Sequence, residues 1–177
     1  MRAIALLLLP LAACSAGVQS APPAGTEQGV KPATTEGACA ADVFTAEVRT
    51  QPDVGKAIVS LTNHGSKSCP LKGNPEITFT LSDGRPVNVP VEKVPQPGRG
   101  ADFTVQPGET AYAGLKWTAC EGADCQKVEG IRVGLPVGGT LVARWFGSDG
   151  AQQMAAVPVK TAQVGTLQQA AQGVIAW

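Results

Sequence analysis

Residues 57–84, AIVSLTNHGSKSCPLKGNPEITFTLSDG, decide the fold class of this chain. Apolar side chains occupy alternate positions over 57–61, and a polar turn at 63–66 ends the run. The same alternation returns over 77–81, ahead of a Ser-Asp-Gly turn at 82–84. Because alternate side chains of a strand point to the same face, the stretch predicts two strands that each bury one face.

Similar short runs recur at roughly ten-residue spacing along the chain, and turn residues separate them. They cover residues 44–48, 87–91, 103–105, 111–117, 131–135, 140–146 and 155–160. Pro86 and Pro90 confine the run at 87–91 to a sheet edge, because proline has no N–H to donate. No long stretch with helical apolar spacing lies between the runs. The pattern predicts an all-β fold, an antiparallel immunoglobulin-like β-sandwich.

The C-terminal segment has a different pattern. Its apolar residues fall at helical spacing: Leu167, Ala170, Ala171, Val174 and Ile175. We therefore predict a short C-terminal helix over 166–172. Trp177 follows this segment and is expected to dock on the domain, with binding of a partner as the alternative.

The N-terminal stretch Leu11-Ala12-Ala13-Cys14 follows Arg2 and an apolar run at 3–9. A cationic start, a short apolar core and small residues before a cut describe a secretory signal peptide. Because the cut would fall before a cysteine, the motif resembles the lipobox of bacterial lipoproteins. The resemblance implies a signal peptide at 1–13 and a lipid anchor on Cys14. A secreted protein with an incidental Cys14 is the alternative.

Residues 14–38 then form a segment rich in Ala, Pro, Gly, Ser and Thr, without strand or helix periodicity. This composition predicts a disordered linker that joins the lipidated cysteine to a single domain at 39–177. We expect the protein at the cell envelope, on the extracytoplasmic side; Ser15 favours the outer membrane if the organism has two. The formal net charge of 0 argues against nucleic acid as a partner.

Four cysteines follow Cys14, and an even number in an exported protein indicates disulfides. Cys39 begins the first strand and Cys69 lies just past the end of the second, so antiparallel pairing would bring them together. Cys120 and Cys125 flank a short turn that can bring its own ends together. We predict the pairs Cys39–Cys69 and Cys120–Cys125. A zinc site at 120–125 is disfavoured, because structural zinc needs four ligands.

Two stretches, 59–84 and 105–117, together resemble the domain-of-unknown-function family 4232. The resemblance covers about residues 39–135, and it implies an exported or lipid-anchored protein with an immunoglobulin-like sandwich. It implies no enzymatic activity, because the family has no agreed one. Asn74 departs from the family pattern, which often has an aromatic residue before the proline. Within the first stretch, Asn63 and Gly65 suit the positive φ angles of a tight connection.

His64 is the chain's one histidine and lies in a polar turn. Nucleophilic catalysis would need a neighbouring Ser or Cys and an orienting acid, and no serine lies in a Gly-x-Ser-x-Gly elbow. We therefore expect an exposed turn histidine and no catalytic residue. Exported copper carriers use clusters of Met and His, and only Met154 and His64 remain after processing. We expect no metal and no cofactor.

The three tryptophans could form a ligand platform. Trp117 alternates with core residues and is expected to be buried. The pattern leaves Trp145 open, because the odd- and even-numbered residues of 141–146 compete for the inner face.

The sequence thus predicts a lipid-anchored, non-enzymatic binding or accessory module of the cell envelope. Its partners would be the membrane, through the lipid, and an envelope protein or ligand. The candidate surfaces are the edge strand at 87–91 and the loops at 93–101 and 120–126. Two alternatives stay open: an envelope hydrolase around His64, and a small-ligand binder that uses Trp145 and neighbouring loops.

Overall fold

The computed structural model describes residues 39–153 and 155–177, and within them one 3-10 helix, η1 (Ala41–Val43), precedes thirteen strands. The strands are β1 (Phe44–Thr50), β2 (Lys56–Asn63), β3 (Cys69–Leu71), β4 (Glu76–Thr80), β5 (Val91–Lys93), β6 (Phe103–Val105), β7 (Thr110–Thr118), β8 (Gln126–Val128), β9 (Gly130–Gly134), β10 (Thr140–Val142), β11 (Arg144–Phe146), β12 (Val157–Val159) and β13 (Thr161–Val164). The predicted signal peptide at 1–13 and the lipidated Cys14 with its linker at 14–38 lie outside the described residues.

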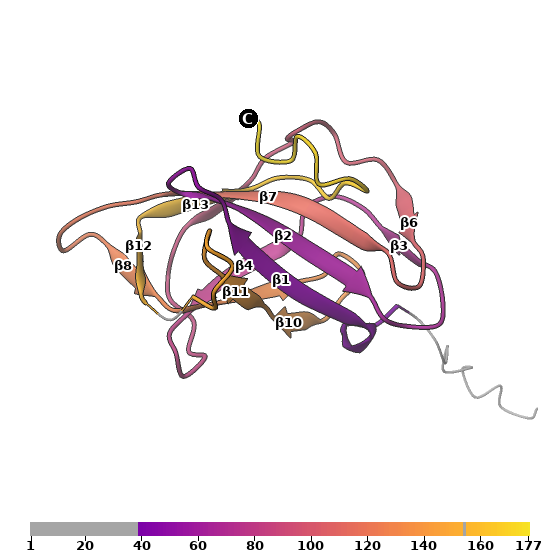
Figure 1. The fold of residues 1–177 in the computed structure, drawn as a ribbon, viewed down its shortest axis with the longest axis horizontal. Helices are drawn as coiled ribbons and strands as arrows, with labels where there is room; N and C mark the ends of the chain where they lie inside the picture. Colours follow the sequence, from indigo (N-terminus) through magenta and orange to yellow (C-terminus); the bar gives the residue numbers. More distant parts are fainter. Residues whose placement is uncertain (1–38, 154) are drawn as a thin grey trace, which may run out of the picture. The chain divides into compact units, whose positions relative to one another are not determined.

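The largest sheet has six strands in the order β11-β1-β2-β7-β13-β5 (Figure 1). Strands β1, β2, β7 and β13 pair antiparallel, whereas β11 and β5 add in parallel at the two edges. The sheet is therefore mixed rather than purely antiparallel. Each edge strand is far in sequence from its neighbour, which leaves room for the crossover that parallel pairing needs.

A three-stranded antiparallel sheet, β10-β9-β4, forms the second layer, and two short pairs, β3-β6 and β12-β8, complete the domain (Figure 1). One core cluster joins the layers. It includes Val59 and Leu61 of β2, Leu115 of β7, Phe79 of β4 and Ile131 of β9, each at most 1% exposed. Their alternation with exposed neighbours is the pattern that predicted the strands, and the all-β sandwich is confirmed.

The strand predicted at 87–91 is displaced. The edge strand β5 begins only at Val91, whereas Pro86 makes a single bridge to Thr80 of β4. The carbonyl of Pro90 accepts a hydrogen bond from the Ala162 N–H at 2.9 Å, and the parallel ladder with β13 follows from there. The two prolines shorten the strand because neither can donate to a ladder. Its predicted position at a sheet edge is confirmed.

The helix predicted over 166–172 is wrong. The Thr166 hydroxyl donates to the carbonyls of Gln96 and Gly98, in the loop that follows β5, and Gln168 exchanges two backbone hydrogen bonds with Tyr112 of β7. These partners hold the backbone extended, so its N–H groups are not available for helical hydrogen bonds. Gly173 then takes a φ of +81° in the turn that follows.

The two disulfides join the predicted cysteines. Cys39 and Cys69 have a Cα–Cα distance of 5.4 Å, and Cys120 and Cys125 one of 5.7 Å. The first pair forms because β1 and β2 run antiparallel and place the start of one strand beside the end of the other. The second closes the loop that follows β7.

The turn after β2 works differently from the prediction. Gly65 does not take a positive φ. Instead the Asn63 side chain, which is 0% exposed, organises the turn by hydrogen bonds. Its Nδ2 donates to the Lys67 and Val105 carbonyls at 2.8 and 3.0 Å, and its Oδ1 accepts from the Gly65 N–H at 2.9 Å. Asn63 therefore joins β2, the turn and β6.

Candidate functional site

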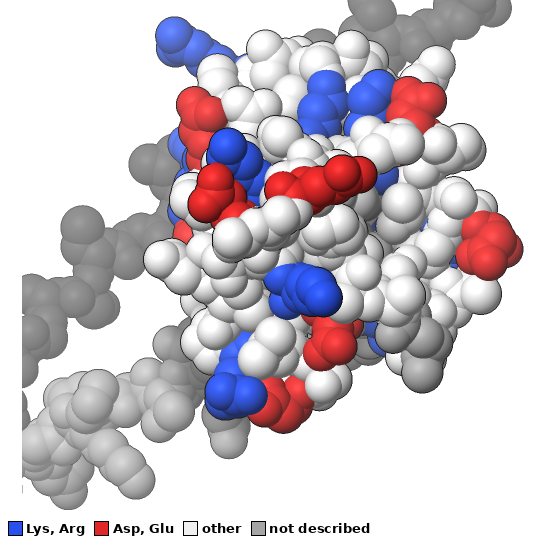
Figure 2. Space-filling view, turned by 90° about the vertical axis from the view of Figure 1, so that its left-hand side faces the viewer, with Lys and Arg blue, Asp and Glu red and all other residues white. Residues whose placement is uncertain are grey.

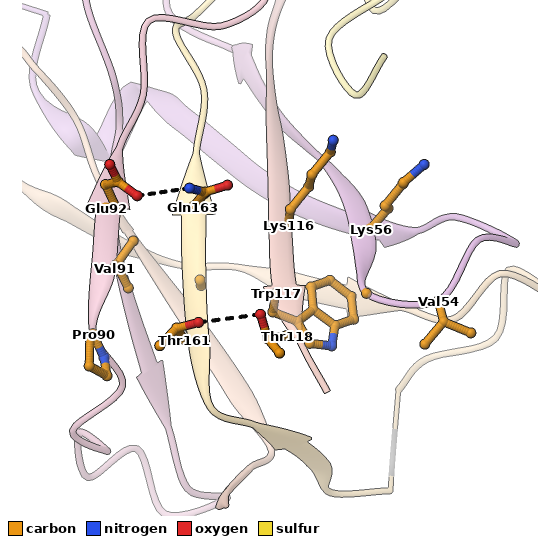
Figure 3. A pocket seen from close by; sticks show the side chains of 12 residues that line it. Val54, Lys56, Pro90, Val91, Glu92, Lys116, Trp117, Thr118, Thr161 and Gln163 are labelled. Atoms are coloured by element: carbon orange, nitrogen blue, oxygen red, sulfur yellow. Dashed lines mark hydrogen bonds between the residues drawn. The ribbon is translucent and has the colours of Figure 1, made fainter. Parts of the chain in front are cut away.

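A row of polar side chains crosses four neighbouring strands on the outer face of the large sheet. In the register, Lys56 of β2 faces Lys116 of β7, Lys116 faces Gln163 of β13, and Gln163 faces Glu92 of β5. Their chain neighbours Ala57, Leu115, Ala162 and Val164 are buried. Because successive side chains of a strand point to opposite faces, the row points away from the core (Figure 3).

The row belongs to the lining of an open groove with a volume of about 640 Å³. Residues 54–56, 90–92, 116–118 and 161–163 line it. Val54 contributes apolar surface, and the Thr161 hydroxyl donates to the Thr118 hydroxyl at 3.3 Å. Val91 and Trp117 alternate with the polar row, so their side chains pack on the core side of the sheet. Convergent polar groups in a concave surface of this volume are features that sites for small molecules share.

A second cavity, of about 420 Å³, lies beside β6 and the start of β7. Glu109 is the one charged residue of its lining, and its carboxylate already accepts a hydrogen bond from the Gln106 N–H at 2.9 Å. The groove on the outer face offers more polar groups that could orient a ligand, so we take it as the candidate site.

Two ammonium groups set the charge at one end of the groove. Burial lowers the pKa of Lys116 below its usual value, and the positive charge of Lys56 lowers it further. Lys56 Nζ lies 2.8 Å from Asp53 Oδ2, and its hydrogen bond holds the Asp53 pKa below the usual value. Asp53 is 70% exposed, so this ion pair is weak. Among the described residues, Lys116 has no ion pair.

The far end of the groove is acidic. Gln163 Nε2 donates to Glu92 Oε2 at 2.8 Å, a contact that orients the carboxylate (Figure 3). This charge asymmetry is local. Basic and acidic side chains are interspersed over the face of the molecule that Figure 2 shows.

The C-terminal segment docks beside the lysine end, as expected for Trp177. Gly114 provides the space: a Cβ at this position would lie 1.9 Å from the Val174 carbonyl oxygen and 3.2 Å from the Trp177 ring. Val174 is 0% exposed. Lys116 Nζ lies 4.3 Å from the centroid of the Trp177 ring, a cation–π contact that links the segment to the groove.

Of the other two tryptophans, Trp117 differs from expectation, whereas the orientation of Trp145 had been left open. Trp117 is half-buried rather than buried. Trp145 is 3% exposed, donates from Nε1 to the Thr50 hydroxyl at 3.0 Å, and packs edge-on against Trp117 at 6.2 Å. The odd-numbered residues of 141–146 thus face inward. A ligand platform that uses Trp145 is wrong, because its ring lies in the core.

The predicted surfaces contribute unequally. The edge-strand region supplies Pro90, Val91 and Glu92 to the groove, whereas the loops at 93–101 and 120–126 do not line it. His64 is exposed as expected, and its Nε2 lies 2.9 Å from the Thr45 hydroxyl.

No group of three or more His, Cys, Asp and Glu side chains suited to a metal ion occurs within 39–153 and 155–177. No helix in this part of the chain is long and apolar enough to cross a membrane.

Residues 39–168 match the family model described as Domain of unknown function (DUF4232). This chain belongs to that family. The matched residues include all thirteen described strands and the whole lining of the groove. The match extends further than the sequence resemblance, which ended near residue 135. No curated protein and no solved structure matches this member of DUF4232 significantly.

Sequence reasoning missed the residues that now define the site, namely Lys56, Lys116, Gln163 and Glu92. Their positions on the outer face follow from the alternation of each strand, so the sequence could have predicted that these side chains point outward. Their alignment in one row depends on the register of four strands, and no two of these strands are consecutive in the sequence. The sequence pattern does not specify that register.

Proposed function

We propose that this DUF4232 protein is a non-enzymatic binding or accessory module, held at the extracytoplasmic side of the cell envelope by a lipid on Cys14. The groove on the outer face of the large sheet carries the binding part of this proposal. It combines a cationic end and an oriented carboxylate on one face of one sheet. Such an arrangement suits recognition, for which a few polar groups fix the ligand's orientation.

The hydrolase alternative around His64 receives no support from the site's geometry. The ring's described side-chain partner is the Thr45 hydroxyl, and nucleophilic catalysis would need the base to be oriented by an acid. We therefore carry the binding proposal alone.

The binding proposal can be tested with a photocrosslinking amino acid at one of two matched valines. Val54 lines the groove and is 86% exposed, whereas Val142 lies on β10 of the other layer and is 77% exposed. In intact cells, irradiation should give a defined adduct from position 54 and none from 142. The position-54 adduct should be lost when Lys116→Glu is added. Adducts from 142 alone, or from neither position, would contradict the groove as the binding site.

The anchor requires a separate test. It rests on the Leu11-Ala12-Ala13-Cys14 motif behind a cationic and apolar leader. Wild-type protein from cells should partition into a detergent phase, and Cys14→Ser should leave it unprocessed or in the aqueous phase. Equal partitioning of the two proteins would refute lipidation.

A further inference from the structure

We propose that the lysine end of the groove binds the oxyanion of a small organic anion, a carboxylate or phosphate that carries an apolar group. This inference rests on the proposed function, since it names the ligand class of the same groove. Lys56 and Lys116 would bind the oxyanion, and the apolar side chains beside them, Val54 and Trp177, would hold the apolar group.

The register makes the two lysines a pair. They lie directly opposite each other on antiparallel strands β2 and β7, where opposite Cβ atoms are about 5 Å apart. Figure 3 shows the two side chains running side by side in the same direction. Two ammonium groups at this spacing can donate to different oxygens of one carboxylate or phosphate, which makes charge-assisted hydrogen bonds.

The pair is unfavourable without an anion. Like charges directly opposite each other destabilise a sheet. Lys116 is partly desolvated, and its described neighbours include no ion-paired carboxylate. Its Nζ contacts the Trp177 ring instead. Lys56 is held by Asp53, an exposed residue whose ion pair is easily exchanged. An oxyanion would neutralise both cations.

The rest of the groove sets the shape and charge of the ligand. The exposed Val54 and the Trp177 ring, whose centroid lies 4.3 Å from Lys116 Nζ, offer apolar contact beside the lysines. Glu92, at the opposite end of the polar row, would repel a second negative charge. The ligand is therefore expected to carry one anionic end and an uncharged body. A free amphiphilic anion and a lipid headgroup both have this chemistry.

Calorimetric titration of the full chain carrying Cys14→Ser tests the inference. The probes are octyl phosphate, octanoate and the uncharged octyl glucoside, each below its micelle-forming concentration. We expect octyl phosphate or octanoate to bind and octyl glucoside not to bind. Equal binding of octyl glucoside, or no binding of either anion, would overturn the inference.

Vesicles of phosphatidylcholine, with and without phosphatidylglycerol, distinguish the two sources of the anion. Binding of octyl phosphate with no vesicle binding assigns a free anion. Additional binding to the phosphatidylglycerol vesicles that Lys116→Gln abolishes assigns a lipid headgroup. Vesicle binding that Lys116→Gln leaves unchanged would place recognition elsewhere and overturn the inference.

Three substitutions locate the site. Lys116→Gln should weaken anion binding by about tenfold or more, because it removes a charge-assisted contact. Lys127→Gln, an equal charge change on β8 outside the groove, should leave it unchanged. Asp53→Asn should tighten binding about two- to fivefold, since it frees Lys56 from its ion pair. A merely structural role of the lysines would not produce tighter binding in Asp53→Asn, and unchanged or weaker binding there would overturn the paired-lysine site.

Failure of the inference and failure of the proposed function are separable. An adduct at Val54 in cells without anion binding in vitro would refute the ligand class and leave the groove as the binding site. The absence of both would refute the two proposals together.

Discussion

Asn63→Ala tests the most demanding local feature of the fold. The side chain is 0% exposed and makes three hydrogen bonds, with the Lys67 and Val105 carbonyls and the Gly65 N–H. Alanine removes all three. The bond to Val105 is buried, so that carbonyl would be left without this donor inside the protein.

The expected loss follows from these contacts. Each hydrogen bond contributes about 1 kcal/mol net, and a buried carbonyl without a donor costs about 1–3 kcal/mol. With two bonds at about 1 kcal/mol each and the buried carbonyl at about 1–3 kcal/mol, we expect Asn63→Ala to lower the free energy of unfolding by about 3–5 kcal/mol. Asn63→Asp keeps the size of the side chain but presents oxygen to two carbonyls, so the loss should be at least as large.

Urea denaturation followed by tryptophan fluorescence measures these losses as a shift in midpoint at constant slope. His64→Ala is the control, because it changes the next residue, which is exposed and makes one side-chain hydrogen bond. It should cost no more than about 0.5 kcal/mol. A loss below about 1 kcal/mol in Asn63→Ala would mean that water replaces the amide, and would refute the reasoning.

The remaining predictions concern the disulfides, the C-terminal segment and the lysine pair. In the chain-entropy model Cys39→Ser should cost about 3.7 kcal/mol and Cys125→Ser about 2.2, because the first bridge closes the longer loop; urea melts of the oxidised proteins measure both. Gly114→Ala should displace the C-terminal segment and speed its amide exchange, and unchanged exchange would contradict the docking described above. NMR titration should give Lys116 a pKa below 10.5 that rises in Lys56→Gln. Because the unfolded chain holds this proton more tightly, the free energy of unfolding from this group should rise as the pH climbs from the folded pKa to 10.5.

The fold was largely predictable because strand alternation and turn residues are local signals. The sequence predicted the sandwich, the edge position of the proline-rich strand and both disulfide pairs. It failed where distant partners override local spacing. The residues at 166–172 have helical spacing, but Gln168 bonds to Tyr112 of β7, far away in the sequence. From the sequence, Asn63 was assigned a role through its backbone φ angle. In the structure its buried side chain determines its role.

Asn74 makes the same point. From the sequence, Asn74 was notable only as a departure from the family pattern. In the structure its Nδ2 donates to the Val94 and Val164 carbonyls at 2.9 and 3.0 Å, so it joins the ends of β5 and β13. One of these partners, Val164, lies ninety residues from Asn74 in the sequence. The role of the amide can therefore be recognised only in the folded chain.

The candidate site was less predictable for a related reason. The alternation of β7 places Lys116 outside and its neighbours inside, but the importance of Lys116 depends on Lys56 lying opposite it. Cross-strand register is a property of the assembled sheet, and a shift by one residue would separate the pair. Trp117 and Trp145, which seemed the stronger candidates for ligand contact in the sequence, pack against each other on the core side of the sheet.

The central claim, that the groove is the binding site, can be tested without knowing the ligand. A small membrane-permeant amine-acetylating reagent is applied to intact cells and, in parallel, to the purified protein, and peptide mass spectrometry then quantifies each lysine. The account predicts that Lys56 and Lys116 are acetylated less in cells than in the purified protein, whereas the exposed Lys127 is acetylated equally in both. Equal acetylation of Lys56 and Lys116 in both samples, or protection of Lys127 alone, would contradict it.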